Sequence, residues 1–201
     1  MNKKCRTINQ NGRSMIKMLG VLAIIGVLSV GGIAGYPKAM MKFKINKTID
    51  QITQISQNVR MLYGRQMLKY HNLDSRTLYK DNLAPKEMFD SGYMTNAWGE
   101  VFNMIGVGAY FGLATMIPSE EACIELATQD WESRDTTGLN SVIIVSSALP
   151  NDDSIWGNCS GEKGNGYAVA CSGGANISLP MPVDIAVEAC SSENLIYWFF
   201  Q

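Results

Sequence analysis

The chain has 201 residues, a length that accommodates one domain and an additional segment. Its hydrophobic content of 46% is ordinary for a folded protein and excludes a chain that is disordered throughout. The 17 basic and 18 acidic side chains give a net charge of −1, which excludes a strongly basic protein that binds nucleic acid through charge alone.

An uncharged apolar run is the first element along the chain. Residues 18–36 contain no charged side chain, and nineteen helical residues are long enough to cross the hydrocarbon core of a bilayer. Basic residues lie on both sides of this run, so the positive-inside rule orients it only weakly. They are Lys3, Lys4, Arg6, Arg13 and Lys17 before the run, and Lys38, Lys42 and Lys44 after it.

The leader MNKKCRTINQNG, the junction between Gly12 and Arg13, and the following SMIKMLGVLAIIGVLSV together resemble the type IV prepilin family. The resemblance implies that a prepilin peptidase removes residues 1–12 as a leader peptide and methylates the new amino terminus at Arg13. It also implies a helix that first anchors the subunit in the membrane and later forms the filament core. Lys17 departs from the family, which normally has at this assembly position a glutamate that pairs with a neighbour's amine.

Two other interpretations of the apolar run stay open. A secretory signal peptide also has a basic start, an apolar core and small residues at its cleavage site, and the Gly-Ile-Ala sequence of residues 32–34 fits such a site. A generic membrane anchor is the other interpretation. The mature N-terminus distinguishes these classes, because the prepilin interpretation predicts Arg13 and ordinary secretion predicts Gly35.

The helix is predicted to continue beyond the membrane and to cover residues 13–64, with residues 18–36 as the transmembrane part. Its second half carries one apolar stripe, which is expected to pack on the chain's own globular domain. Gly64 is the expected end, because glycine tolerates the left-handed conformation. The stripe consists of Met41, Ile45, Ile49, Ile52, Ile55, Val59 and Leu62.

A weak point is predicted between the two halves of this helix, where we expect a kink in the isolated subunit. Proline removes a backbone hydrogen-bond donor, and each glycine costs roughly 1 kcal/mol relative to alanine in a helix. The residues concerned are Gly31, Gly32, Gly35 and Pro37.

Residues 65–201 are predicted to form a globular head that begins with an irregular segment, residues 65–99, containing one or two short helices. Strands are predicted at residues 100–105 and 109–116. The tetrapeptide Asn96-Ala97-Trp98-Gly99 stands just before them, and a similar element precedes the sheet in pilins and pseudopilins.

The C-terminal half is predicted to alternate short helices and strands. One helix opens at Pro118 and Ser119, with Cys123, Leu126 and Ala127 on its inner face. A second opens at Pro182, and its inner face is expected to carry Val183, Ala186, Val187 and Cys190. Strands are predicted at residues 141–149, 167–171 and 195–200, and a polar loop covers residues 150–174.

Of the five cysteines, Cys5 lies in the leader and four remain after cleavage. An even number in an exported domain indicates two disulfides, for which three connectivities exist. We predict the nested pairs Cys123–Cys190, which would join the inner faces of the two helices, and Cys159–Cys171, which would close the polar loop. The cysteines lack the close C-x₂-C spacing of zinc ligands, so no metal site is expected.

The predicted fold class is α+β, with a long N-terminal helix packed on an antiparallel sheet and a disulfide-stapled C-terminal region. This layout resembles the class-b type IV pilins, including those of conjugative thin pili. No enzyme and no cofactor are expected. The chain has no nucleophile-elbow, zincin or P-loop motif, and its single histidine, His71, lies in the irregular segment. The polar stretch of residues 151–154 lacks the spacing of a calcium loop, and the glycine-rich residues 161–166 open no helix.

These features together predict a structural subunit of a bacterial type IV pilus or a pilus-like filament. Its partners would be other pilin subunits, the prepilin peptidase and assembly machinery, and membrane lipid before assembly. It would reside in the inner membrane as a single-pass precursor, and after assembly in a surface filament or a periplasmic pseudopilus. Removing the leader would leave 14 basic and 18 acidic side chains, a net charge of −4, so no nucleic-acid partner is expected.

Two alternative functions follow from the same features. Because Lys17 replaces the glutamate, the chain could be a minor or tip pilin or a secretion pseudopilin. A function of another class is a signal-anchored extracytoplasmic binding protein that does not polymerise.

Overall fold

The structure is a computed structural model that describes residues 11–65, 70–71, 73–90, 92–131, 138–146, 161–164, 167–172 and 174–201. The chain divides into two compact units, residues 1–41 and residues 42–201. We call the second the head unit; it includes the C-terminal half of the long helix. The predicted leader, residues 1–12, lies outside the described residues except for its last two.

Helix α1 (Asn11–Tyr63) extends through both units as one continuous helix. Gly64 follows it, and its backbone N–H donates to the carbonyl of Arg60 at 2.9 Å. Gly64 does not adopt the positive φ expected of it; the structure instead requires glycine because a Cβ atom would clash with the carbonyl oxygen of Arg60. A close approach of the backbone, rather than a left-handed conformation, therefore explains this glycine.

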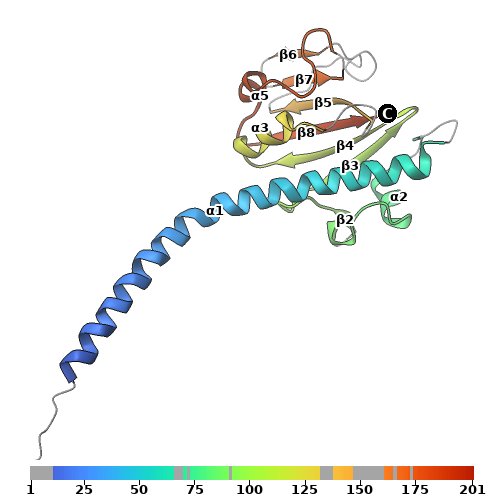
Figure 1. Cartoon of the computed structure of the whole chain (residues 1–201). Coiled ribbons are helices and arrows are strands. Elements are labelled where there is room, and N and C mark those ends of the chain that lie inside the picture. Colours follow the sequence, from blue (N-terminus) through green and yellow to red (C-terminus); the bar gives the residue numbers. More distant parts are fainter. Residues whose placement is uncertain are drawn as a thin grey trace, which may run out of the picture. The chain divides into compact units, whose positions relative to one another are not determined.

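Six antiparallel strands form the main sheet of the head unit, in the order β3-β4-β8-β5-β7-β6 (Figure 1). The β7 strand covers the residues predicted for it, while β3 and β4 lie one or two residues further along the chain than predicted. The strands are β3 (Phe102–Val107), β4 (Tyr110–Ile117), β5 (Leu139–Val145), β6 (Glu162–Gly164), β7 (Tyr167–Cys171) and β8 (Asn194–Phe200).

Short elements surround this sheet. Between α1 and β3 the chain forms α2 (Ser75–Lys80), a 3₁₀ turn (Lys86–Met88) and a two-stranded hairpin of β1 (Phe89–Asp90) and β2 (Tyr93–Met94). Helix α3 (Glu120–Thr128) follows β4, and helix α5 (Val183–Ala189) precedes β8. These elements confirm the α+β class predicted from the sequence.

The predicted stripe of α1 packs into the core of the head unit. Ile45, Ile52, Ile55 and Val59 are completely buried, but Leu62, at the end of the stripe, is half exposed. Burial of the four side chains removes apolar surface from water and attaches the helix to the sheet. The prediction for Leu62 was wrong, because this residue lies in the last turn of α1 and half of its surface is exposed.

The sheet is apolar on both faces. Along β8, Ile196, Trp198 and Phe200 are buried on one face and alternate with half-buried residues on the other. The Phe200 ring stacks on Phe111 of β4, with ring centroids 5.1 Å apart. A second cluster of buried residues lies on the opposite face and consists of Ile143, Val145, Val169 and Cys171.

Candidate functional site

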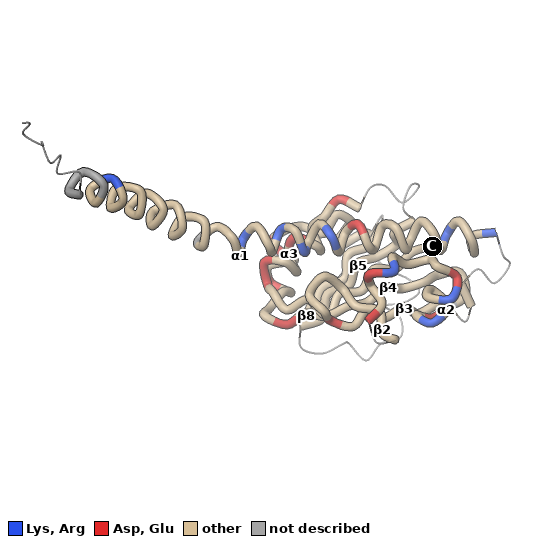
Figure 2. The backbone as a smooth tube through the Cα atoms, turned by 90° about the horizontal axis from the view of Figure 1, so that it is seen from below, with Lys and Arg blue, Asp and Glu red and all other residues tan. Residues whose placement is uncertain are grey.

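The candidate functional site begins with the apolar segment of α1, residues 15–36. All of its described side chains are exposed, and the most apolar part of the helix is not buried within the chain. This is the one helix among the described residues that is long and apolar enough to cross a membrane. Figure 2 shows a long stretch of α1 without charged residues. In the sequence, this stretch follows Lys17. An exposed apolar surface of this length is unfavourable in water.

The residues predicted to direct processing and assembly all lie on this segment or just before it. Gly12 and Arg13 belong to the first helical turns of α1. Lys17 follows one turn later, and its side chain is exposed. Cleavage after Gly12 and methylation of Arg13 stay predictions.

The predicted weak point also lies on α1, but the helix is not interrupted there. Pro37 is inside the helix, and Gly31, Gly32 and Gly35 have no other atoms near the position of a Cβ. No packing contact therefore requires glycine at these three positions. Their low helix propensity is the property that distinguishes them, and the weakness of this segment stays a prediction.

Within the head unit, polar contacts join the C-terminal half of α1 to the other elements, in addition to the buried stripe. Lys42 contacts both carboxylate oxygens of Glu125 on α3, at 2.6 and 2.7 Å. Asn58 donates to the carbonyl of Leu83 at 2.9 Å. Because the ion pair is partly exposed, it specifies the position of α1 more than it stabilises the fold.

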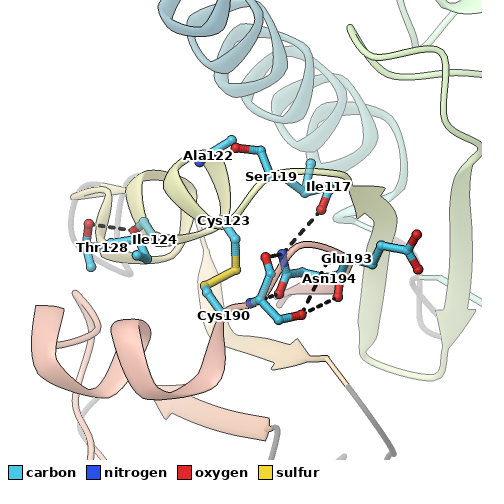
Figure 3. Close-up of a disulfide and its surroundings, with 10 residues drawn as sticks. Ile117, Ser119, Ala122, Cys123, Ile124, Thr128, Cys190, Glu193 and Asn194 are labelled. Carbon is cyan, nitrogen blue, oxygen red and sulfur yellow. Dashed lines mark hydrogen bonds between the residues drawn. A yellow bond between two sulfur atoms is a disulfide. The ribbon is translucent and has the colours of Figure 1, made fainter.

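The disulfide Cys123–Cys190 joins α3 to the residue that follows α5, as predicted (Figure 3). Its Cα atoms are 5.9 Å apart, so the two elements approach closely. Cys171 is also disulfide-bonded, and its predicted partner, Cys159, lies outside the described residues.

The inner face of α5 differs from the prediction. Ala186 and Ala189 are buried beside the disulfide, whereas Val183 and Val187 are 61% and 48% exposed. The prediction was therefore right for Ala186 and Cys190 and wrong for the two valines.

Two buried asparagines hold the ends of the strands, and only the first was identified from the sequence. Asn96 belongs to the predicted tetrapeptide. Asn194 donates to the carbonyls of Ile117 and Ser191 at 3.3 and 2.7 Å and accepts the N–H of Ser191 at 2.6 Å (Figure 3). The run Ser191-Ser192-Glu193-Asn194 was a usable signal, because serine and asparagine favour such local turns.

No group of three or more metal-ligating side chains occurs within the described ranges of the chain. His71 is exposed, and the three described cysteines are all in disulfides. The polar stretch at residues 151–154 lies outside the described residues. The described part of the glycine-rich stretch forms strand β6 and not the start of a helix.

Comparison with protein-family models gives no match to this chain, and comparison with curated proteins gives none either. The fold is nevertheless compatible with a pilin-like protein, since a long N-terminal apolar helix continues into a head built on an antiparallel sheet.

Proposed function

We propose that this protein is a structural subunit of a bacterial type IV pilus or a pilus-like filament. One observation carries the proposal. A single helix has an exposed, uncharged apolar half at residues 18–36 and a second half whose buried stripe packs in the head unit. The first half needs an apolar environment outside its own chain. The second half is part of the folded head unit, so the head unit is carried to wherever the first half inserts.

The same apolar surface suits two successive environments. Val21, Val27 and Ile33 are each at least 56% exposed, and at 3.6 residues per turn their spacing of six residues points them in three different directions around the helix. Lipid tails cover such a surface on every side in a membrane, and a bundle of identical helices covers it in a filament. Removal of the leader after Gly12, with methylation of Arg13, would separate the first state from the second.

The head unit suits the outside of a filament. Its disulfide Cys123–Cys190 is consistent with an oxidising compartment beyond the inner membrane. We propose that other pilin subunits contact α1, that the prepilin peptidase and assembly machinery act on the precursor, and that lipid surrounds residues 15–36 before assembly. The assembled product would lie at the cell surface or in the periplasm.

Lys17 favours a more specific role as a minor or tip subunit. Its exposed ammonium group stands near the start of the apolar segment, where a filament core would be dry. A subunit at the tip has no neighbour above it whose amine needs a carboxylate, so the absence of the glutamate costs it least.

The decisive experiment places a photo-crosslinking amino acid at Leu28, which is 69% exposed in the middle of the apolar segment. The full chain is expressed with a type IV assembly machinery, and surface filaments are sheared off and analysed by mass spectrometry. We expect adducts between Leu28 and the N-terminal helix of another pilin subunit. Adducts with lipid alone, together with an absence of this chain from the filaments, would contradict the proposal.

A further inference from the structure

A groove lies on the head unit between α2, the β1–β2 hairpin and strand β3. Its volume is about 1240 Å³. Buried Ala84, Met94 and Phe102 contribute to its lining, while Tyr79 and Tyr93 are 63% and 67% exposed. Phe89 packs edge-to-face against Tyr79, with ring centroids 4.9 Å apart, and so limits the orientations of that tyrosine.

Cations outnumber anions in the lining of this groove. Arg76, Lys80 and Lys86 are exposed and line it, and Figure 2 shows basic residues on α2. Asp74 is the acidic residue in the lining, and its carboxylate accepts the N–H and the hydroxyl of Thr77, both at 2.8 Å. The bond from the hydroxyl, and then the bond from the N–H, lower the pKa of Asp74. The Asp74 carboxylate therefore caps the start of α2.

The groove cannot receive a peptide as an additional β-strand, although β3 is at the edge of the sheet. Isolated bridges pair Ile105 of β3 with Asp74, and Val101, just before β3, with Thr95. The N–H of Met104 donates to the hydroxyl of Ser75 at 3.2 Å. The N–H of Gly106 donates to the carbonyl of Leu73 at 2.9 Å, so the segment before the hairpin already occupies part of this edge. A ligand in the groove would therefore contact side chains and would not pair with the backbone of β3.

We propose that this groove binds an acidic oligosaccharide. Arg76 and the two lysines suit a carboxylate, sulfate or phosphate group on the sugar. The exposed rings of Tyr79 and Tyr93 suit the apolar C–H faces of sugar rings. Asn82 and Asn103 line the same groove, and their amides can bond sugar hydroxyls. A head unit that is acidic elsewhere favours a sparsely charged sugar over a nucleic acid.

This ligand class deepens the proposed function, because a surface filament could use it to bind an acidic sugar. Only this biological role rests on the proposed function. Binding itself requires the head unit alone. The test therefore uses the full chain in detergent micelles, where no filament is needed. A failure to form filaments leaves this test intact, and a failure to bind sugar leaves the test at Leu28 intact.

The chain is applied to immobilised oligosaccharides that bear a uronate, a sialate, a sulfate or a phosphate, each beside its neutral analogue. We expect retention on acidic members, weakened by salt. The double variant Arg76→Gln/Lys86→Gln should weaken binding by about a hundredfold or more, since it removes two charge-assisted hydrogen bonds to the acidic group. Tyr93→Ala should weaken it without changing the salt dependence.

Matched controls are Lys47→Gln and Phe43→Ala, which change a cation and an exposed ring on α1 outside the groove. Both should bind like the parent chain. The proposal is overturned by an absence of retention, by equal retention on neutral analogues, or by groove variants that bind normally. Competition by inorganic phosphate as strong as by the acidic sugar, or stronger retention of an acidic peptide or single-stranded DNA, would also overturn it.

Discussion

The phenol of Tyr63 donates a 2.6 Å hydrogen bond to the carboxylate of Asp81, which joins the last residue of α1 to the residue that caps α2. The bond raises the pKa of Tyr63 to about 12, with smaller contributions from burial and from the charge of Asp81. The contact thus links the end of the long helix to the segment that lines the groove.

Loss of the Tyr63 proton should destabilise this link. Because the pKa of Tyr63 is raised in the folded state, the contribution is fully present below pH 10 and is lost as pH rises from 10 towards about 12. Tyr63→Phe should cost no more than about 1 kcal/mol at neutral pH, since the bond is exposed to solvent. A tyrosinate absorbance titration measures the pKa: the variant should lack one phenol that titrates near pH 12, and a missing phenol near pH 10 would contradict the link.

The sequence predicts most of the fold because the main signals are local. The stripe at Ile45, Ile52 and Ile55 needs only helical periodicity, and Ser119 marks the start of α3 because its hydroxyl accepts the N–H of Ala122 at 3.3 Å. Strand β7 is a short apolar run, and turn residues delimit it at both ends. Such patterns arise within one element and need no knowledge of its neighbours.

The incorrect predictions concern positions whose burial depends on contacts between elements that are far apart in the sequence. Val183 and Val187 match the helical period of the inner face of α5, yet they are exposed, and Ala189 is buried in their place. The groove could not be predicted either, because it joins side chains from α2, the hairpin and β3. Its shape depends on how an irregular segment returns to the edge of the sheet, and no short sequence motif specifies that path.

Replacement of Asn96 should be one of the most damaging single changes in the head unit. Its amide donates to the hydroxyl of Thr115 at 2.9 Å and to the carbonyl of Met116 at 2.8 Å. Its side-chain oxygen accepts the N–H groups of Trp98 and Glu100 at 2.8 and 3.0 Å. Asn96→Ala leaves these groups without their partner, so we expect a loss of about 2–3 kcal/mol in urea unfolding.

Asn103→Ala is the matched control for that variant, because Asn103 is exposed on the neighbouring strand β3. It should change the free energy of unfolding by no more than about 0.5 kcal/mol. Equal stabilities of the two variants would show that the Asn96 network contributes little.

Removal of the disulfide between α3 and α5 should strongly destabilise the head unit. The bond connects residues separated by 67 positions, and the chain-entropy relation gives about 4 kcal/mol for a loop of that size. We expect the double variant Cys123→Ala/Cys190→Ala to unfold at correspondingly lower urea. Peptide mapping without reduction should recover Cys159 joined to Cys171 in both proteins; a peptide joining Cys123 to Cys171 would refute the nested pairing.

Processing should depend on the small residue at the end of the leader. Gly12→Val is expected to accumulate as a full-length precursor in the membrane when expressed with a prepilin peptidase, while the parent chain yields a methylated N-terminus at Arg13. Intact mass and N-terminal peptides distinguish the two products. Asn11→Ala, one position earlier, serves as the control and should mature normally. Normal maturation of Gly12→Val, or a mature start at Gly35, would contradict the prepilin proposal.

Lys17 should limit the ability of this chain to polymerise alone. In a filament core an unpaired charge is costly, and Lys17 places a positive charge near the terminal amine and close to Arg13, where the family's glutamate would neutralise a neighbour. In the membrane the cost is smaller, because Lys17 lies near the end of the span and its ammonium can reach the headgroups. The chain should therefore enter filaments poorly unless a partner subunit supplies the acid.

The test compares the parent chain with Lys17→Glu, each expressed as the only pilin of a type IV assembly machinery. Filament counts by electron microscopy should rise strongly in the variant, while the amounts of mature subunit in the membrane stay equal. Lys38→Glu, beyond the other end of the apolar run, is the control for a change of charge alone and should not increase the count. Abundant filaments from the parent chain would refute the prediction, because a homopolymer would then tolerate Lys17 through another counter-charge or a shifted helix register.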